Sequence, residues 1–471
     1  MKSRARSFRD PAGRLHFVGD SPVRQVYAEA AEECRALVGG EFFQGMMKTG
    51  ELVRTRVLDK PPGQLASVTR PGELLLAHES IPFPSFPAEW CGEMLKAAAL
   101  LTLEMAERGL SRGVGLKDAT PYNVLFKGSR PIFVDVLSFE RRDPCDPVWL
   151  AHGQFMRTFL LPLLAASHLG LPLSSLFIIR RDGVEPEQLY RMLGPLDRVR
   201  PRFLSPVSLP VWLSGRAERE GEAVYRPRRL KSGEQAEFVL RTQLKGLRRQ
   251  VERSWRPPAR STWSDYSKSC SYEKEAFDQK SSFVEEFLRQ TRPGRVLDIG
   301  CNSGHFSRLA AVAGSEVVAL DQDPVVVGEL YQKSAEKGMN ILPLVVDFAR
   351  PTPSAGWNNE ETPSFLARAR GRFDALFMLA LVHHLSVTDQ IPLEEVLALA
   401  ARITNRHLVI EYVPPEDPQF KRLTRGRDSL YRHLTREHFE RTAAQHFTIR
   451  KRTQVIDQER WLYVMEKNPL V

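Results

Sequence analysis

The feature that most constrains this sequence is a strand–turn–helix segment, "RVLDIGCNSGHFSRLAA", at residues 295–311. An apolar run, an acid, a glycine turn and an amphipathic run follow one another without a gap. This order predicts a strand that ends in a tight turn where a helix begins, so that backbone N–H groups point toward a ligand. Gly300 and Gly304 give the turn its conformational freedom. Asn302 stands between them, and Asn tolerates a positive φ best after glycine.

Four further apolar runs follow this segment, at residues 316–321, 342–347, 374–379 and 407–412. Stretches with helical spacing separate them, and a hairpin-like stretch at residues 447–467 closes the chain. Alternation of strands and helices favours a parallel sheet covered on both faces. We therefore predict an α/β, Rossmann-like domain whose seven-stranded sheet is mostly parallel, with an antiparallel hairpin at one edge.

Acids stand at the ends of the first three predicted strands. Asp298 comes directly before the turn, where a carboxylate suits a ligand that carries a cationic amine and a sulfonium. Asp321 ends the second strand, where it can bond a ribose diol. Asp347 ends the third strand, where it can accept a hydrogen bond from an adenine amino group.

With these acids, residues 263–471 resemble the class I S-adenosylmethionine-dependent methyltransferases. The resemblance implies S-adenosyl-L-methionine as cofactor and no metal. It places Tyr266, Tyr272 and Lys280 on a segment that runs over the cofactor. The cofactor-binding residues it implies are Asp298, Gly300, Cys301, Asn302, Gly304, Asp321, Gln322, Asp347 and Phe348.

The methyl acceptor is expected beyond the fourth strand, because ligands of open parallel sheets bind at the carboxyl ends of the strands. His384 is the candidate general base, since a histidine near neutral pH can take a proton from a hydroxyl or an amine. The same "HHL" sequence also suits structural capping. We expect the acceptor pocket to include Trp357, His383, Glu411 and Tyr412. No motif for methylation of nucleic-acid bases is present, which favours a small-molecule or glycan acceptor.

A second motif, "LKDATPYNVLFKGSRPIFVDVLSFE", lies at residues 116–140. The spacing of Asp118, Asn123 and Asp135 matches the catalytic Asp and the two metal ligands of kinase-like phosphotransferases. Short strand-like runs around one helix precede the motif, and helical spacing follows it. Residues 10–250 therefore resemble an α+β, kinase-like fold of the small-molecule phosphotransferase kind. The sequence departs from that pattern because it has no glycine-rich loop and no clear strand lysine.

The predicted domains are a kinase-like, largely degenerate domain at residues 1–252, a linker at 253–262 and a methyltransferase domain at 263–471. The whole chain, including "LKDATPYNVLF" and "ALVHHL", resembles bacterial nodulation-protein-related methyltransferases. Three hypotheses follow. The first is a methyltransferase whose N-terminal module recognises the acceptor or a partner. The second is a bifunctional enzyme that also transfers phosphate from Mg-ATP, through Asp118, Asn123 and Asp135. The third is a non-catalytic sensor.

The composition narrows the setting of these functions. The net charge of +10 is concentrated at residues 226–260. The simplest interpretation of this basic stretch is a solvated helix face, and binding of an anionic partner is the alternative. No apolar stretch is long enough to predict a membrane span, and no secretory signal is evident. The five cysteines are scattered and form no CxxC pair. A cytoplasmic enzyme is expected, and the sequence leaves its oligomeric state open.

Overall fold

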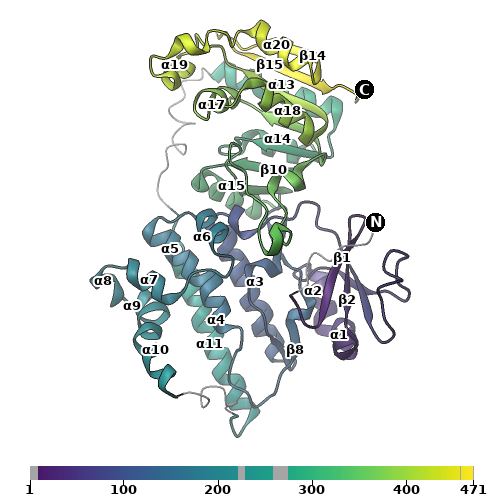
Figure 1. Cartoon of the computed structure of the whole chain (residues 1–471), viewed down its shortest axis with the longest axis vertical. Coiled ribbons are helices and arrows are strands. Elements are labelled where there is room, and N and C mark those ends of the chain that lie inside the picture. The colour runs from purple at the N-terminus through teal and green to yellow at the C-terminus, as the bar shows by residue number, and fades with distance from the viewer. Residues whose placement is uncertain (1–8, 221–228, 258–273, 457, 470–471) are drawn as a thin grey trace. The chain divides into compact units, whose positions relative to one another are not determined.

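The computed structural model describes residues 9–220, 229–257, 274–456 and 458–469, without side chains for residues 215–220 (Figure 1). The chain divides into two compact units. The first contains Met1–Lys127, Pro131–Pro257 and Ala355–Thr362. The second contains Gly128–Arg130, Pro258–Ser354 and Pro363–Val471.

The first unit begins with a four-stranded antiparallel sheet in the order β1-β2-β4-β3. The predicted short strands and the one predicted helix, α1, are present, while α2 was not predicted. Apolar side chains from this sheet and its flank, including Val23, Leu65 and Leu75, form a small core. The elements are β1 (Gly13–Val18), β2 (Ser21–Val26), α1 (Ala28–Gly39), α2 (Glu41–Thr49), β3 (Thr55–Val57) and β4 (Leu74–His78).

Two short hairpin-like pairs carry the second sequence motif. β5 (Val114–Leu116) pairs with β8 (Phe139–Arg141), and β6 (Val124–Lys127) forms a two-stranded sheet with β7 (Arg130–Phe133). Asp118 follows β5, Asn123 directly precedes β6 and Asp135 follows β7. The turns between these strands therefore bring together residues that are up to 17 positions apart.

The rest of the first unit is helical, as its apolar spacing predicts. Helix α11 packs against α3 and buries a stripe of Leu240, Leu244, Leu247 and Val251. Lys245 and Arg249 are exposed on this helix, as expected for a solvated basic face. The helices are α3 (Gly92–Leu110), α4 (His152–Phe155), α5 (Leu161–Leu169), α6 (Leu173–Ile179), α7 (Pro186–Met192), α8 (Pro195–Arg198), α9 (Pro201–Phe203), α10 (Leu209–Glu220) and α11 (Gly233–Ser254).

The second unit contains the predicted seven-stranded sheet, in the order β11-β10-β9-β12-β13-β15-β14. The five strands from β11 to β13 are parallel, and β15 joins β13 antiparallel. The Rossmann-like prediction for this half is confirmed. The strands are β9 (Arg295–Ile299), β10 (Glu316–Asp321), β11 (Ile341–Val345), β12 (Phe373–Met378), β13 (Thr404–Tyr412), β14 (Phe447–Gln454) and β15 (Trp461–Lys467).

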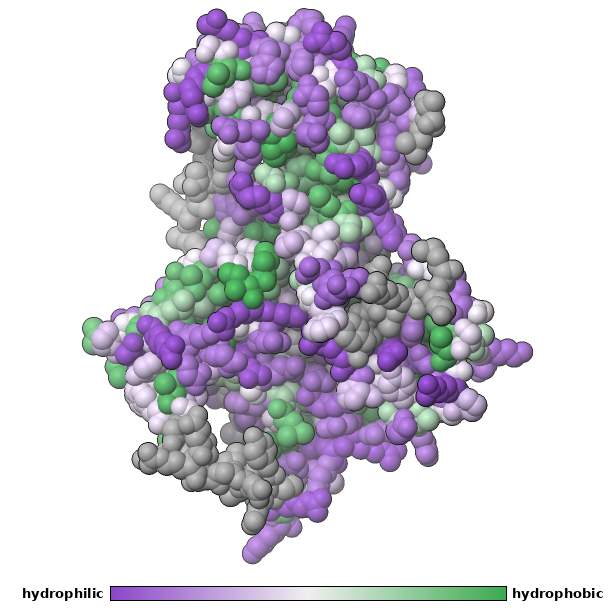
Figure 2. Space-filling view, viewed as in Figure 1, coloured by the Kyte–Doolittle hydropathy of each residue, from purple (hydrophilic) through white to green (hydrophobic). Residues whose placement is uncertain are grey.

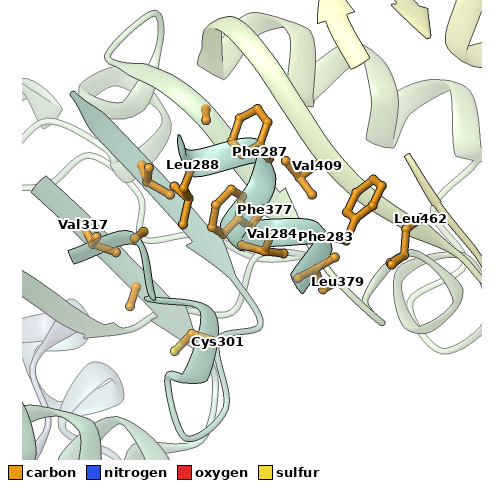
Figure 3. Packing of buried hydrophobic residues seen from close by; sticks show 14 of the residues in the cluster. Phe283, Val284, Phe287, Leu288, Cys301, Val317, Phe377, Leu379, Val409 and Leu462 are labelled. Carbon is orange, nitrogen blue, oxygen red and sulfur yellow. The ribbon is translucent and has the colours of Figure 1, made fainter. Parts of the chain in front are cut away.

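Helices cover this sheet. Helix α13, which precedes β9 in the chain, packs against one face. Figure 3 shows Phe283, Val284 and Phe287 of α13 packed toward Phe377 and Val409 of the sheet. Ring centroids of Phe287 and Phe377 lie 6.0 Å apart in an edge-to-face arrangement. The helices are α13 (Lys274–Thr291), α14 (His305–Val312), α15 (Pro324–Glu336), α16 (Phe365–Ala369), α17 (Val382–Val387), α18 (Leu393–Ile403), α19 (Pro418–Thr424) and α20 (Arg436–Ala444).

Within the described residues, no helix has both the length and the apolarity needed to cross a bilayer. The described cysteines Cys34, Cys91, Cys145 and Cys301 are free thiols.

Candidate functional site

The glycine turn after β9 has the positive φ angles that its sequence predicts, but its N–H groups donate within the chain rather than toward a ligand. Gly300, Asn302 and Gly304 all have positive φ, at +75°, +48° and +73°. The N–H groups of Gly300 and Cys301 both donate to the carbonyl of Leu320, at 2.8 and 2.9 Å. A Cβ on Gly304 would lie 2.4 Å from Leu330 Cδ1, so glycine is required there for space as well as for conformation.

Asp298 lies directly before this turn and is only 2% exposed. Its Oδ2 accepts a hydrogen bond of 2.5 Å from Ser307 Oγ on α14. Burial raises the pKa of Asp298 to about 6, and the Asp321 carboxylate adds to this rise while the Ser307 bond opposes it. A cation placed beside Asp298 would favour the ionised carboxylate, so the site suits a positively charged ligand group.

Asp321 ends β10 and is fixed by two backbone donors. The N–H of Asn302 in the glycine turn donates to Oδ2 at 2.9 Å, and the N–H of Asp323 donates to Oδ1 at 3.0 Å. Burial raises the pKa of Asp321. Gln322, the next residue, is exposed. The carboxylate is thus held in one orientation beside the turn before any ligand binds.

Asp347 follows β11 by two residues, and Phe348 beside it is buried. Asp347 Oδ1 accepts from the Ala349 N–H, and Oδ2 pairs with Arg350 at 2.9 Å. Arg350 also pairs with Asp389 at 3.1 Å, and its side chain is 72% exposed. An adenine amino group would have to share Oδ2 with this arginine or displace it, at small cost because the pair is solvent-exposed.

The ends of β9, β10 and β11 are neighbours in the sheet and run in the same direction. Asp298, Asp321 and Asp347 therefore lie along one edge, as the sequence predicts. Of the segment predicted to run over the cofactor, Tyr266 and Tyr272 lie outside the described residues. Lys280 is described, and it pairs with Glu411.

The two histidines follow β12 on α17, with ring centroids 4.3 Å apart. Burial moves the pKa of His383 well below its usual value and also lowers that of His384. Both imidazoles are therefore neutral near pH 7. Neither ring nitrogen of His383 has a hydrogen-bond partner among the described residues. A neutral His384 has the protonation state that a general base needs.

Glu411 is fully buried at the end of β13, within a cluster of four buried charges. Lys280 Nζ on α13 lies 2.6 Å from Glu411 Oε1, and Arg460 Nη1 lies 3.6 Å from the same oxygen. Arg460 also pairs with Asp417 at 2.7 Å. Glu411 Oε2 has no hydrogen-bond partner among the described atoms. Sequence reasoning assigned no role to Arg460 or Asp417.

Tyr412 does not join Glu411. Successive side chains of a strand point to opposite faces, and Tyr412 packs against Phe439, while its hydroxyl donates to the Leu434 carbonyl at 2.8 Å. Trp357 is 69% exposed and belongs to the segment Ala355–Thr362, which groups with the first unit. Their expected place in an acceptor pocket stays a prediction.

In the first unit, the predicted trio of Asp118, Asn123 and Asp135 comes together around Ser138. Asn123 Nδ2 donates to Ser138 Oγ at 2.8 Å, and Ser138 Oγ donates to Asp135 Oδ2 at 2.8 Å. Asn123 Nδ2 also lies 3.5 Å from the Asp118 carbonyl. Burial raises the pKa of Asp118, and the charge of Asp135 adds to this rise.

Asp135 of this trio pairs with Arg24, a buried residue on β2 that sequence reasoning did not single out. Its Nη2 lies 2.9 Å from Asp135 Oδ1, and its Nη1 lies 3.9 Å from Asp10. Among the described residues, no group of three or more His, Cys, Asp or Glu side chains is arranged to hold a metal ion.

Comparison with known proteins adds two sequence findings. A family of methyltransferase domains matches residues 272–455. The nodulation protein NoeA of Rhizobium meliloti (strain 1021) is 30% identical over 473 residues, which cover 98% of this chain and 96% of that protein.

Among solved structures, the N-methyltransferase NodS from Bradyrhizobium japonicum WM9 aligns with 42% of this chain and 99% of its own, at 16% identity and a TM-score of 0.31. The bifunctional kinase-methyltransferase WbdD aligns with 41% of this chain and 39% of its own, at 18% identity and a TM-score of 0.29. Likenesses of this strength carry no argument about substrate.

Proposed function

We propose a division of roles within this chain, which belongs to the nodulation protein NoeA family and is an S-adenosylmethionine-dependent methyltransferase. The second unit binds the methyl donor and transfers its methyl group to a small-molecule or glycan acceptor. The first unit is a kinase-like module that recognises the acceptor or a partner and does not transfer phosphate. The observation that carries the methyl-transfer half is the row of carboxylates at the ends of β9, β10 and β11.

The side chains along that edge fit S-adenosylmethionine. Asp298 is a buried carboxylate at the start of the glycine turn, and its ionised form gains from a cationic amine. Asp321 presents an oriented carboxylate for a ribose diol, with Gln322 next to it. Asp347 and Phe348 would flank the adenine. Cys301 and Asn302 would contribute their backbone carbonyl groups, since the N–H groups of both already donate within the chain.

The residues of this chain position the methyl donor and the acceptor. When bound, S-adenosylmethionine supplies an electrophilic methyl group on a sulfonium. An in-line transfer gains most from holding donor and acceptor in the correct geometry. A proton leaves a hydroxyl or amine acceptor, and we assign its removal to His384. The lowered pKa of His384 supports this role, because the imidazole is then neutral at pH 7 and can accept a proton.

Cofactor affinity should depend on pH through Asp298. A protonated Asp298 has no charge to offer a cationic amine, so affinity should fall as the pH drops through about 6. With a pKa near 6, about a tenth of Asp298 is ionised at pH 5, which predicts roughly tenfold weaker binding than at pH 7.5.

Calorimetric titration of the folded protein at both pH values measures this difference. Asp298→Asn should flatten the profile. An affinity that rises toward pH 5 would contradict the role of Asp298.

For the first unit, the contact between Arg24 and Asp135 supports a recognition role. Kinase-like phosphotransferases use Asp and Asn side chains to hold Mg²⁺ against the phosphates. Here the guanidinium of Arg24 already neutralises Asp135, and Asn123 is tied to Ser138. A metal ion would have to displace a partly buried ion pair before the trio could act.

The gathering of Asp118, Asn123 and Asp135 also favours a second candidate, the bifunctional methyltransferase and phosphotransferase. The third hypothesis, a non-catalytic sensor, has no observation in its favour.

One experiment separates the first two candidates. The purified chain is titrated by calorimetry with S-adenosylmethionine and, separately, with Mg-ATP. We expect one site for the first ligand and no heat of binding for the second. Binding of Mg-ATP that disappears in Asp135→Asn, with S-adenosylmethionine binding unchanged, would favour the bifunctional enzyme over the recognition module. Failure to bind S-adenosylmethionine would overturn the proposed cofactor site.

A further inference from the structure

An unusual share of the exposed apolar side chains lies on one short part of the first unit. Six of the 18 large hydrophobic residues found exposed in the described chain fall between Met192 and Leu213. Single exposed apolar residues are normal on protein surfaces, but a group of this density marks an interaction site. The group, called here the α7–α10 surface, consists of Met192 (56% exposed), Leu196 (78%), Val199 (58%), Leu209 (41%), Trp212 (48%) and Leu213 (51%).

This surface is built on an ordered support. Trp212 Nε1 donates to the Tyr190 hydroxyl at 3.0 Å, which ties α10 to α7. The guanidinium of Arg198 on α8 lies over the Tyr190 ring, 4.2 Å from its centroid. Beneath these contacts Leu189 and Phe203 are fully buried. Except for Val199, which lies between α8 and α9, the exposed apolar side chains therefore belong to packed helices. Figure 1 draws α7, α8, α9 and α10 as one group, and Figure 2 shows hydrophobic residues interleaved with hydrophilic ones over that group.

The charge around the surface has one dominant sign. Residues 186–214 contain four arginines, at positions 191, 198, 200 and 202, and two acids, Glu187 and Asp197. Asp197 is already engaged by Arg200 at 2.6 Å and by His168 at 3.1 Å. Arg191 and Arg202 are both exposed. The surface thus presents aliphatic side chains within an excess of positive charge.

We propose that the α7–α10 surface docks the protein on an anionic lipid bilayer. Leucine, valine, methionine and tryptophan side chains next to arginines match the boundary between acyl chains and phosphate headgroups, where apolar burial and electrostatic attraction add. Trp212 is the one aromatic residue of the surface, whereas single-stranded nucleic acids are bound on several stacking rings. Docking is peripheral, because the described helices cannot span a bilayer.

Co-sedimentation with vesicles tests this docking. The full chain should sediment with vesicles of phosphatidylglycerol and phosphatidylcholine, and much less with phosphatidylcholine alone. Leu196→Ser/Leu213→Ser should lower the partition coefficient on anionic vesicles about tenfold, because two apolar side chains no longer enter the interface. Arg191→Glu/Arg200→Glu should lower it at least as much on anionic vesicles, with a weaker effect at high salt.

Two variants serve as matched controls. Val148→Ser/Leu150→Ser removes two apolar side chains that are 50% and 71% exposed elsewhere in the same unit. Arg54→Glu/Arg229→Glu makes the same charge change at side chains that are 75% and 73% exposed. Both should bind vesicles as the unaltered chain does. A chain that stays in the supernatant with anionic vesicles would overturn the proposal. So would equal losses in the control and test variants, or retention on a DNA duplex with no binding to vesicles.

Discussion

Asp298→Ala and Asp321→Ala should each weaken S-adenosylmethionine binding by up to about a hundredfold. Asp298 is a buried carboxylate next to the glycine turn, and Asp321 is oriented by the N–H groups of Asn302 and Asp323. A lost hydrogen bond to a charged group costs up to about 3 kcal/mol, and each 1.4 kcal/mol changes the affinity about tenfold. Calorimetry measures the dissociation constants, and circular dichroism checks that each variant is folded.

Two further variants make this result specific. Asp298→Asn keeps a side chain of the same shape that Ser307 can still contact but removes the negative charge, so it should lose most of the affinity that Asp298→Ala loses. Glu336→Ala removes an exposed acid at the end of α15 and should bind S-adenosylmethionine normally. Normal affinity in both Asp298→Ala and Asp321→Ala would contradict the assigned cofactor site.

The row of acids was predictable because it depends on local order along the chain. Each acid follows an apolar run, and parallel strands bring their carboxyl ends to one edge without information from distant residues. The positive φ of Asn302 was predictable for the same reason. The five parallel strands and the closing hairpin were predictable from periodicity, since a doubly covered sheet requires continuous apolar strands.

What the sequence did not reveal depends on side chains that are far apart in the chain. Lys280 and Glu411 are 131 residues apart, and Arg460 and Asp417 are 43 apart. Arg24 meets Asp135 across more than a hundred residues. No local sequence pattern around any of these residues identifies its partner. A lysine on an amphipathic helix is ordinarily solvated, so only the packing of α13 on the sheet shows that Lys280 is buried.

Helix α2 was missed for a local reason. Its sequence, "EFFQGMMKT", is nine residues long and contains Gly45, which lowers the helix propensity of a segment already short of three turns. Tertiary packing compensates, because Phe43 and Met46 are almost completely buried and Phe43 meets Phe139 edge to face at 5.0 Å. The helix forms because burial of these side chains in the core stabilises it.

Lys280→Met should destabilise the second unit strongly. It removes the cation that lies 2.6 Å from Glu411, while both side chains are at most 5% exposed. Breaking a buried ion pair by removing one partner costs about 3–5 kcal/mol, because the remaining charge is left buried. Arg460, 3.6 Å from Glu411, offsets part of this cost but is also engaged by Asp417. We expect a loss near the lower end of that range, measured as the shift in urea unfolding.

Comparison with two other variants identifies the cause of that loss. Lys280→Met/Glu411→Leu removes both charges and should recover most of the stability, since apolar side chains of similar volume replace a buried pair at little cost. Lys451→Met removes a lysine that pairs with Glu286 at the same distance of 2.6 Å, but with side chains 40% and 36% exposed. Solvent screens that pair, so its loss should change stability by less than about 1 kcal/mol. If the double variant were no more stable than Lys280→Met, the cause would be lost packing rather than an uncompensated charge on Glu411.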